Sequence, residues 1–202
     1  MTDRPSTDID DEPPASAADA MAIIQSEQAR QEPNIGPYFL LWGAAWVFIG
    51  LAWFGAESEV WAPDVAGITT GVLVLAGCAV SAVLGARMGR GVAGPSSRFG
   101  AMYGFGWFAA MAGTGALAAV LATTAGEAGA DLIPALFVFV VGVMYTVTGA
   151  FHRCIPDYAL GLVVQAVAVT TAFTPGPWNT LVMGIGGGGA LVAMGIYRGV
   201  RR

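Results

Sequence analysis

A series of long apolar runs, separated by short polar breaks, occupies the chain from Pro37 to Tyr197. The first run, residues 37–55, reads PYFLLWGAAWVFIGLAWFG and carries no charge. As a helix it would be about 28 Å long, close to the thickness of a hydrocarbon core of about 30 Å. Only 11% of all residues are charged, whereas soluble domains have about a quarter. The sequence therefore predicts an integral membrane protein in contact with the lipid bilayer.

Six of these runs have the length and composition of transmembrane helices. We predict an all-α, polytopic six-helix bundle with spans at about 37–55, 65–86, 99–124, 132–151, 157–173 and 180–197. Residues 1–36 then form an acidic cytoplasmic tail, 37–197 the transmembrane domain and 198–202 a basic cytoplasmic end. Two similar motifs, Trp42-Gly43-x-x-Trp46 and Tyr103-Gly104-x-x-Trp107, suggest that the bundle consists of three repeated helical hairpins.

The distribution of arginine predicts the orientation in the membrane. All nine basic residues are Arg, and the links at 56–64, 125–131 and 174–179 contain none of them. Because Lys and Arg are retained on the cytoplasmic side, both termini are predicted to be cytoplasmic. The residues expected to anchor this topology are Arg87, Arg90, Arg98, Arg153 and Arg198.

The N-terminal tail contains eight of the fourteen acidic residues. Ser16 followed by Asp19 resembles a helix start, which predicts a short helix near 16–32. That helix either folds inward or docks on a cytoplasmic or membrane protein partner through residues 1–36. From residue 37 onward seven Arg face six acids, so we expect no nucleic-acid partner.

Small residues recur at helix-packing distances within the runs. Gly67 and Gly71 are four residues apart, as are Gly100 and Gly104. In lipid such spacing lets helix backbones approach closely, and it predicts a tight bundle. A homo-oligomer built through the same Gly/Ala seams is compatible with this pattern.

Gly186 to Gly189 form the most unusual run of the chain. Consecutive glycines either break the last span, as in transporters with midplane binding sites, or provide a flat surface for another helix. Gln165 is the most polar side chain in the middle of a span, and it either bonds a neighbouring helix or contacts a solute. If there is a solute site, its contacts are expected at Gln165, Gly186, Gly187, Gly188 and Tyr145.

Reactive residue types are sparse. His152 and Cys154 are too few for a metal site, which requires three or four ligands. We found no pair of carboxylates within a span and no nucleophile with a base. The sequence predicts no enzyme activity, no catalytic residue, no metal and no cofactor.

The segment AMAIIQSEQARQ, followed by a run that begins PYFLLWGAAW, resembles uncharacterised small polytopic membrane proteins of actinobacteria. This resemblance covers residues 17–50 and rests on short, common motifs. It implies a bacterial inner (plasma) membrane and no particular activity.

Two functions are consistent with these features. The first is a non-enzymatic interaction or accessory protein, because an acidic tail is joined to spans without mid-span charges. The second is a transporter or permease for a neutral or apolar solute, which requires a cavity near Gly186 and Gln165.

Overall fold

The computed structural model describes residues 16–23, 34–90 and 95–200, and it divides into two units, 1–34 and 35–202. In the first unit, residues 17–23 are helical. The Ser16 hydroxyl accepts the backbone N–H of Asp19 at 3.1 Å and donates to the Asp19 carboxylate at 2.7 Å. The predicted helix start at Ser16 is therefore confirmed, while its continuation over 24–33 lies outside the described residues.

The second unit is built from helices, and the described residues contain no strand. The helices are α2 (Gly36–Glu57), α3 (Pro63–Met88), α4 (Pro95–Phe151), α5 (Ile155–Phe173), α6 (Trp178–Leu181), the π-helix η1 (Val182–Gly188) and α7 (Gly189–Val200). Five helical stretches are long and apolar enough to cross a membrane, with α6, η1 and α7 counted as one. The predicted all-α class and the apolar spans are confirmed at this level.

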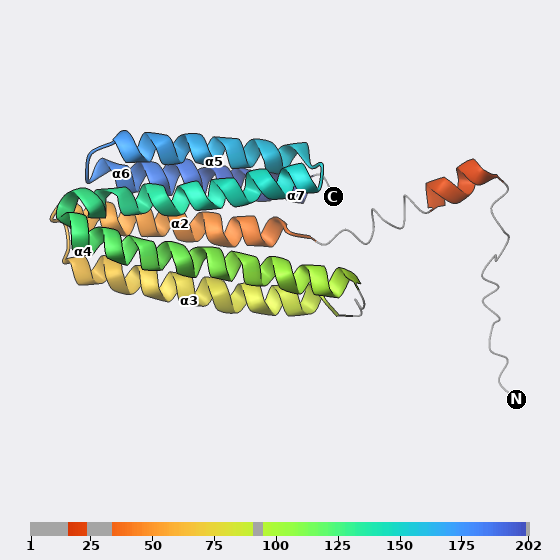
Figure 1. Cartoon of the computed structure of the whole chain (residues 1–202), viewed down its shortest axis with the longest axis horizontal. Coiled ribbons are helices and arrows are strands. Elements are labelled where there is room, and N and C mark those ends of the chain that lie inside the picture. Colours follow the sequence, from red (N-terminus) through yellow and green to blue (C-terminus); the bar gives the residue numbers. More distant parts are fainter. Residues whose placement is uncertain (1–15, 24–33, 91–94, 201–202) are drawn as a thin grey trace, which may run out of the picture. The chain divides into compact units, whose positions relative to one another are not determined.

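The 57-residue helix α4 is interrupted at Gly126, where φ is 58° and ψ is −136°. Glycine reaches this left-handed region without a Cβ penalty, and the chain folds back there (Figure 1). Side chains join the two halves far from this residue: the rings of Trp107 and Tyr145 lie 5.2 Å apart, and the hydroxyls of Tyr103 and Thr148 lie 3.3 Å apart. The link expected at 125–131 is thus a helix reversal at a single residue.

The helices of the second unit follow one another as neighbours in space. α3 packs on α2, and α2 packs on the α6–η1–α7 segment; this segment contacts α5, which lies along α4. Phe39, Val138, Val164 and Leu191 are at most 2% exposed and contribute to the core between these helices. Among the described residues, α2 is the only helix with Cα atoms within 8 Å of those of α3, although α3 and α4 overlap in the view of Figure 1.

Glycines form the seam between α2 and the last helical segment. A Cβ atom on Gly43 would lie 2.7 Å from the carbonyl oxygen of Gly188, and one on Gly50 would lie 2.7 Å from Cα of Gly184. Each glycine thus meets backbone atoms of the other helix. This close approach fits the expectation that the Gly186–Gly189 run offers a flat surface to another helix, although Gly43 and Gly50 were not among the glycines predicted to pack.

The prediction that spaced glycines bring helices together is wrong within the chain for Gly67 and Gly71 of α3 and for Gly100 and Gly104 of α4. A Cβ atom at any of these four positions would meet no atom within 4 Å. For α3 the reason is topological: its neighbour is α2, and it meets α2 through the face that carries Thr70 and Ser81.

Polar groups of aromatic side chains join α2 to α3. The Tyr38 hydroxyl donates to the Ser81 carbonyl at 3.1 Å, and Trp42 Nε1 donates to the Ser81 hydroxyl at 3.1 Å. Near the other end, Trp53 Nε1 donates to the Thr70 hydroxyl at 2.9 Å. Because water is absent from a bilayer core, an unpaired ring donor there would be costly, so these bonds favour one register of α3 on α2.

Candidate functional site

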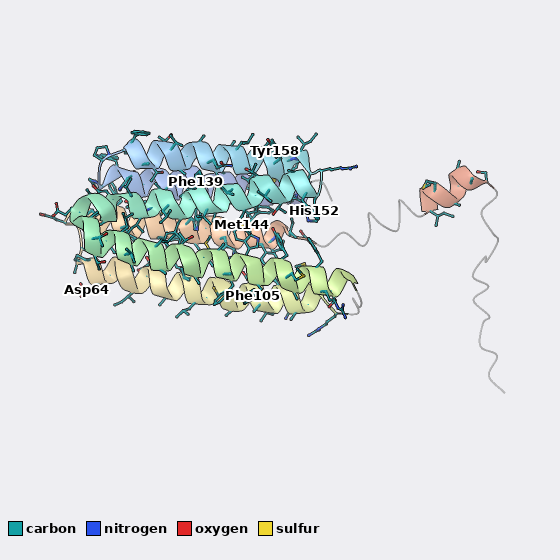
Figure 2. All side chains as sticks on the ribbon, viewed as in Figure 1. Asp64, Phe105, Phe139, Met144, His152 and Tyr158 are labelled. Atoms are coloured by element: carbon teal, nitrogen blue, oxygen red, sulfur yellow. The ribbon has the colours of Figure 1, made fainter. Side chains whose placement is uncertain are left out.

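The predicted anchor arginines gather at one end of the second unit. They belong to the end of α3, the link to α4, the start of α4, the link before α5 and the end of α7, which lie together in Figure 1. Figure 2 shows Asp64 at the opposite end from His152, the neighbour of Arg153. Arg87, Arg90, Arg98 and Arg153 are exposed there. We call this end the arginine-bearing end.

Arg198 differs from the other arginines because it lies within the packed helices. Its Nη2 atom lies 2.5 Å from Oδ1 of Asp157, whose side chain is 10% exposed, against 24% for Arg198. The same nitrogen lies 3.5 Å from Sγ of Cys154, and the guanidinium carbon is 5.6 Å from the centre of the Phe39 ring. The Nε atom of Arg198 is buried without a hydrogen-bond partner. The guanidinium is therefore held by an acid, a thiol and an aromatic face.

The ends of two helices position this pair. Asp157 lies in the first turn of α5, and Arg198 lies in the last turn of α7. A negative charge at a helix N-terminus and a positive charge at a C-terminus are each favoured by the helix dipole. The N-cap residue of α5, Cys154, makes no side-chain capping bond, and the Asp157 carboxylate accepts a hydrogen bond from Arg198.

This ion pair was not predicted from the sequence, where Arg198 was expected at the membrane boundary and Asp157 at the start of a span. A signal was nevertheless present, since Asp157 is the only acidic residue after Asp131. A lone acid at a helix start, on the face that carries the arginines, is a candidate partner for one of them.

Tyr145, a predicted solute contact, lies in an aromatic stack beside the ion pair. Its ring centre is 5.3 Å from that of Phe39 on α2 and 5.2 Å from that of Trp107 on α4. No described Cα atoms of α2 and α4 come within 8 Å of each other. The three rings therefore bridge two helices whose backbones stay apart.

Gln165 joins α5 to α4. Its Nε2 atom donates to the Thr146 hydroxyl at 2.6 Å, and that hydroxyl donates to the Gly142 carbonyl at 2.9 Å. The expected bond from Gln165 to a neighbouring helix is present. Gly142 permits this approach, because a Cβ atom there would lie 2.7 Å from Cγ of Gln165.

Replacing Gln165 by leucine is expected to lower the free energy of unfolding by about 0.6–2 kcal/mol, the range for a hydrogen bond between membrane helices. A double-mutant cycle with Thr146→Val in detergent measures the coupling. If both single variants and the double variant lose the same free energy of unfolding, the Gln165–Thr146 hydrogen bond is the cause. Purely additive losses would show that it contributes nothing.

The three predicted contact glycines face protein groups. A Cβ atom on Gly186 would meet the Val167 side chain at 3.1 Å, and one on Gly187 would meet the Trp46 ring at 2.9 Å. One on Gly188 would lie 2.7 Å from the Gly43 carbonyl oxygen. Gln165 bonds toward α4, whereas these glycines face α2 and Val167 of α5, so their contacts do not converge on one point.

Among the described residues, no group of three or more His, Cys, Asp and Glu side chains could hold a metal ion. The ring of His152 lies nearly perpendicular to those of Phe99 and Phe151, with ring centres 5.6 Å and 5.3 Å away. Searches against protein-family models, curated proteins and solved structures found no match.

Proposed function

We propose that the protein is a six-span integral membrane protein of a bacterial inner membrane, with both termini cytoplasmic, that acts as a non-enzymatic interaction or accessory protein. The count of six treats α4 as two spans joined at Gly126, and it pairs the spans into three helical hairpins. The gathering of arginines at one end supports the orientation, since that end would face the cytoplasm.

The observation that carries this proposal is the pairing of polar groups inside the helices. Gln165 bonds Thr146, and Asp157 pairs with Arg198. Polar side chains that bind a substrate must be free to form hydrogen bonds with it. The four side chains named here already bond one another across helices. Such pairing favours a scaffold over a site of chemistry.

The lateral face of the unit supports a partner within the membrane. Gly67, Gly71, Gly100 and Gly104 present open backbone surface on α3 and α4. Small residues of this spacing let a further helix approach closely. A membrane-spanning partner protein, or a second copy of this chain, would pack on these glycines.

Arginine placement is expected to control the orientation. Replacing Arg87, Arg90 and Arg98 by glutamine and inserting three Arg into 125–131 should disturb insertion of the neighbouring spans, because positive charge is retained inside. Reporter fusions after residues 90 and 128, active only on one side of the membrane, measure the change. A variant with the three glutamines alone is the control. An unchanged reporter pattern would refute the proposed orientation.

The acidic tail is expected to bind the cytoplasmic partner. In-cell crosslinking followed by purification should capture a defined partner with the full chain and lose it when Asp8, Asp10, Asp11 and Glu12 become Asn or Gln. The charge of the tail would then steer association, and the capture should fall with ionic strength. An identical partner set for both proteins would contradict the role of the tail.

A transporter for a neutral or apolar solute is the second candidate, and the π-helix η1 favours it. π-helical turns are rare and frequent at functional sites, and η1 contains the glycines first considered as a midplane break. Solute flux into proteoliposomes tests it. Flux that is lost in Gly187→Leu while the helix content stays unchanged would support transport over the accessory role.

A further inference from the structure

The last helical segment holds one conformational irregularity. η1 spans Val182–Gly188, and α-helix precedes and follows it. A π-helix bonds residue i to i+5, so it accommodates more residues per turn than an α-helix, and it occurs mostly as a single-turn insertion. Gly184 and Gly186 to Gly188 supply four of its seven residues. Most residues of η1 therefore have no side chain that would hinder a change from π-helix to α-helix.

Contacts hold both ends of this segment in place. At the end of the unit opposite the arginine-bearing end, which we call the acidic end, Asn179 is 1% exposed, and its Nδ2 atom donates to the Asp131 carbonyl at 3.0 Å. At the arginine-bearing end, Arg198 pairs with Asp157. Between them, a Cβ atom on Gly195 would lie 2.7 Å from Cγ of Leu40 on α2. The π-helix lies between one polar attachment to α4 and another to α5.

A change of η1 to α-helix would alter the register of α7. If the acidic end stays fixed, α7 turns by roughly 100° and moves along its axis by about 1.5 Å, the rotation and rise of one residue. Each residue then takes the place of the following one. Met194 would occupy the place of Gly195, and Tyr197 that of Arg198.

This second register is incompatible with the observed seam at the arginine-bearing end. A methionine side chain does not fit where a single Cβ atom already approaches Leu40 at 2.7 Å. The carboxylate of Asp157 would also lose its cation. α7 would therefore separate from the beginning of α2, close to Phe39.

We propose that η1 is a register switch for α7 and that the Arg198–Asp157 ion pair is its latch. In the latched state the π-helix lets Gly195 meet Leu40 and Arg198 meet Asp157. Release of the pair allows η1 to become α-helical, the far commoner helix type. α7 then turns and exposes the beginning of α2 at the arginine-bearing end.

A distance measurement between two nitroxide labels tests the switch in the full chain in lipid nanodiscs. The labels are placed at Ile196→Cys on α7 and Leu162→Cys on α5, which are 55% and 48% exposed. Cys78→Ser and Cys154→Ser remove the native thiols, and the serine hydroxyl at 154 retains an acceptor for Arg198. A rotation of roughly 100° moves a side chain on a helix of this diameter by about 8 Å.

Asp157→Asn should add a second distance population displaced by up to about 8 Å, while the control Asp64→Asn should keep the single population of the parent. A single unchanged distance in Asp157→Asn would overturn the proposal. A loss of helix content in this variant would also overturn it, because the pair would then maintain the fold and not the register.

Deletion of Gly186 separates a register change from other motions. Removing the one extra residue should turn η1 into α-helix while both ends keep their contacts, so Asp157→Asn in this background should show one distance. A second population that persists there would contradict the switch. Failure of the deletion variant to fold would contradict the single-residue insertion on which the switch depends.

Discussion

Alanine at Gly188 is expected to destabilise the protein by about 3 kcal/mol, the upper part of the range for overpacking. The new Cβ atom would lie 2.7 Å from the Gly43 carbonyl oxygen and 2.9 Å from the backbone nitrogen of Val47. Both are backbone atoms and cannot move aside as a flexible side chain would, so α2 and the last helical segment must separate. Thermal unfolding in detergent, followed by far-ultraviolet circular dichroism, measures the loss.

Gly189→Ala is the matched control, because a Cβ atom on the next residue meets nothing within 4 Å. Its effect should be neutral or stabilising by up to about 1 kcal/mol, the difference in helix propensity. Equal losses for the two variants would show that helix packing at Gly188 is not the cause. Gly188→Leu distinguishes packing from solute binding: loss of assembly supports packing, and a retained fold with lost transport supports a binding site.

Removal of the Asp157 carboxylate is the second large effect that we expect. Asp157→Ala leaves Arg198 among Phe39, Cys154 and the helix ends without its counter-charge. Breaking a fully buried pair costs about 3–5 kcal/mol. Because the Arg198 side chain keeps 24% exposure, water compensates part of this, and we expect about 1–3 kcal/mol. Chemical unfolding in mixed micelles measures the difference.

Asp64→Ala is the control for the loss of an acid in the first turn of a helix, since Asp64 occupies that position in α3 and is exposed. The charge-swapped double variant, Asp157→Arg with Arg198→Asp, should recover part of the stability through the restored pair. It should not recover all of it, because both swapped charges oppose the helix dipoles. A swap that is no better than the sum of its single changes would show that the ion pair contributes no stability.

Several elements follow from local sequence properties. The run predicted at 37–55 appears as Gly36–Glu57, and the run at 65–86 appears as Pro63–Met88. Hydropathy and the Pro residues near both starts act within one helix, so the residues themselves determine these elements. The start of the tail helix at Ser16 is equally local, since the bonds that define it reach only three residues.

Other features depended on which helices meet. Gly67 and Gly71 have the same spacing as packing glycines, yet they face open space because α3 contacts α2 through other faces. Gly126 was one residue of an expected link, and the reversal of α4 takes place at this residue alone. The spacing of small residues shows that a helix face can pack closely against another helix. Whether it does so depends on which helix lies next to that face.

The sequence by itself determined the helical class, the apolar spans and the division between an acidic tail and an apolar body. These features depend on composition and on interactions between residues that are close in the sequence. Only the tertiary structure decided that Asp157 meets Arg198 across 41 residues and that Gly188 packs while Gly189 does not. Such pairings depend on the relative rotation of helices, and this is set by the packing of all neighbours together and not by any one segment.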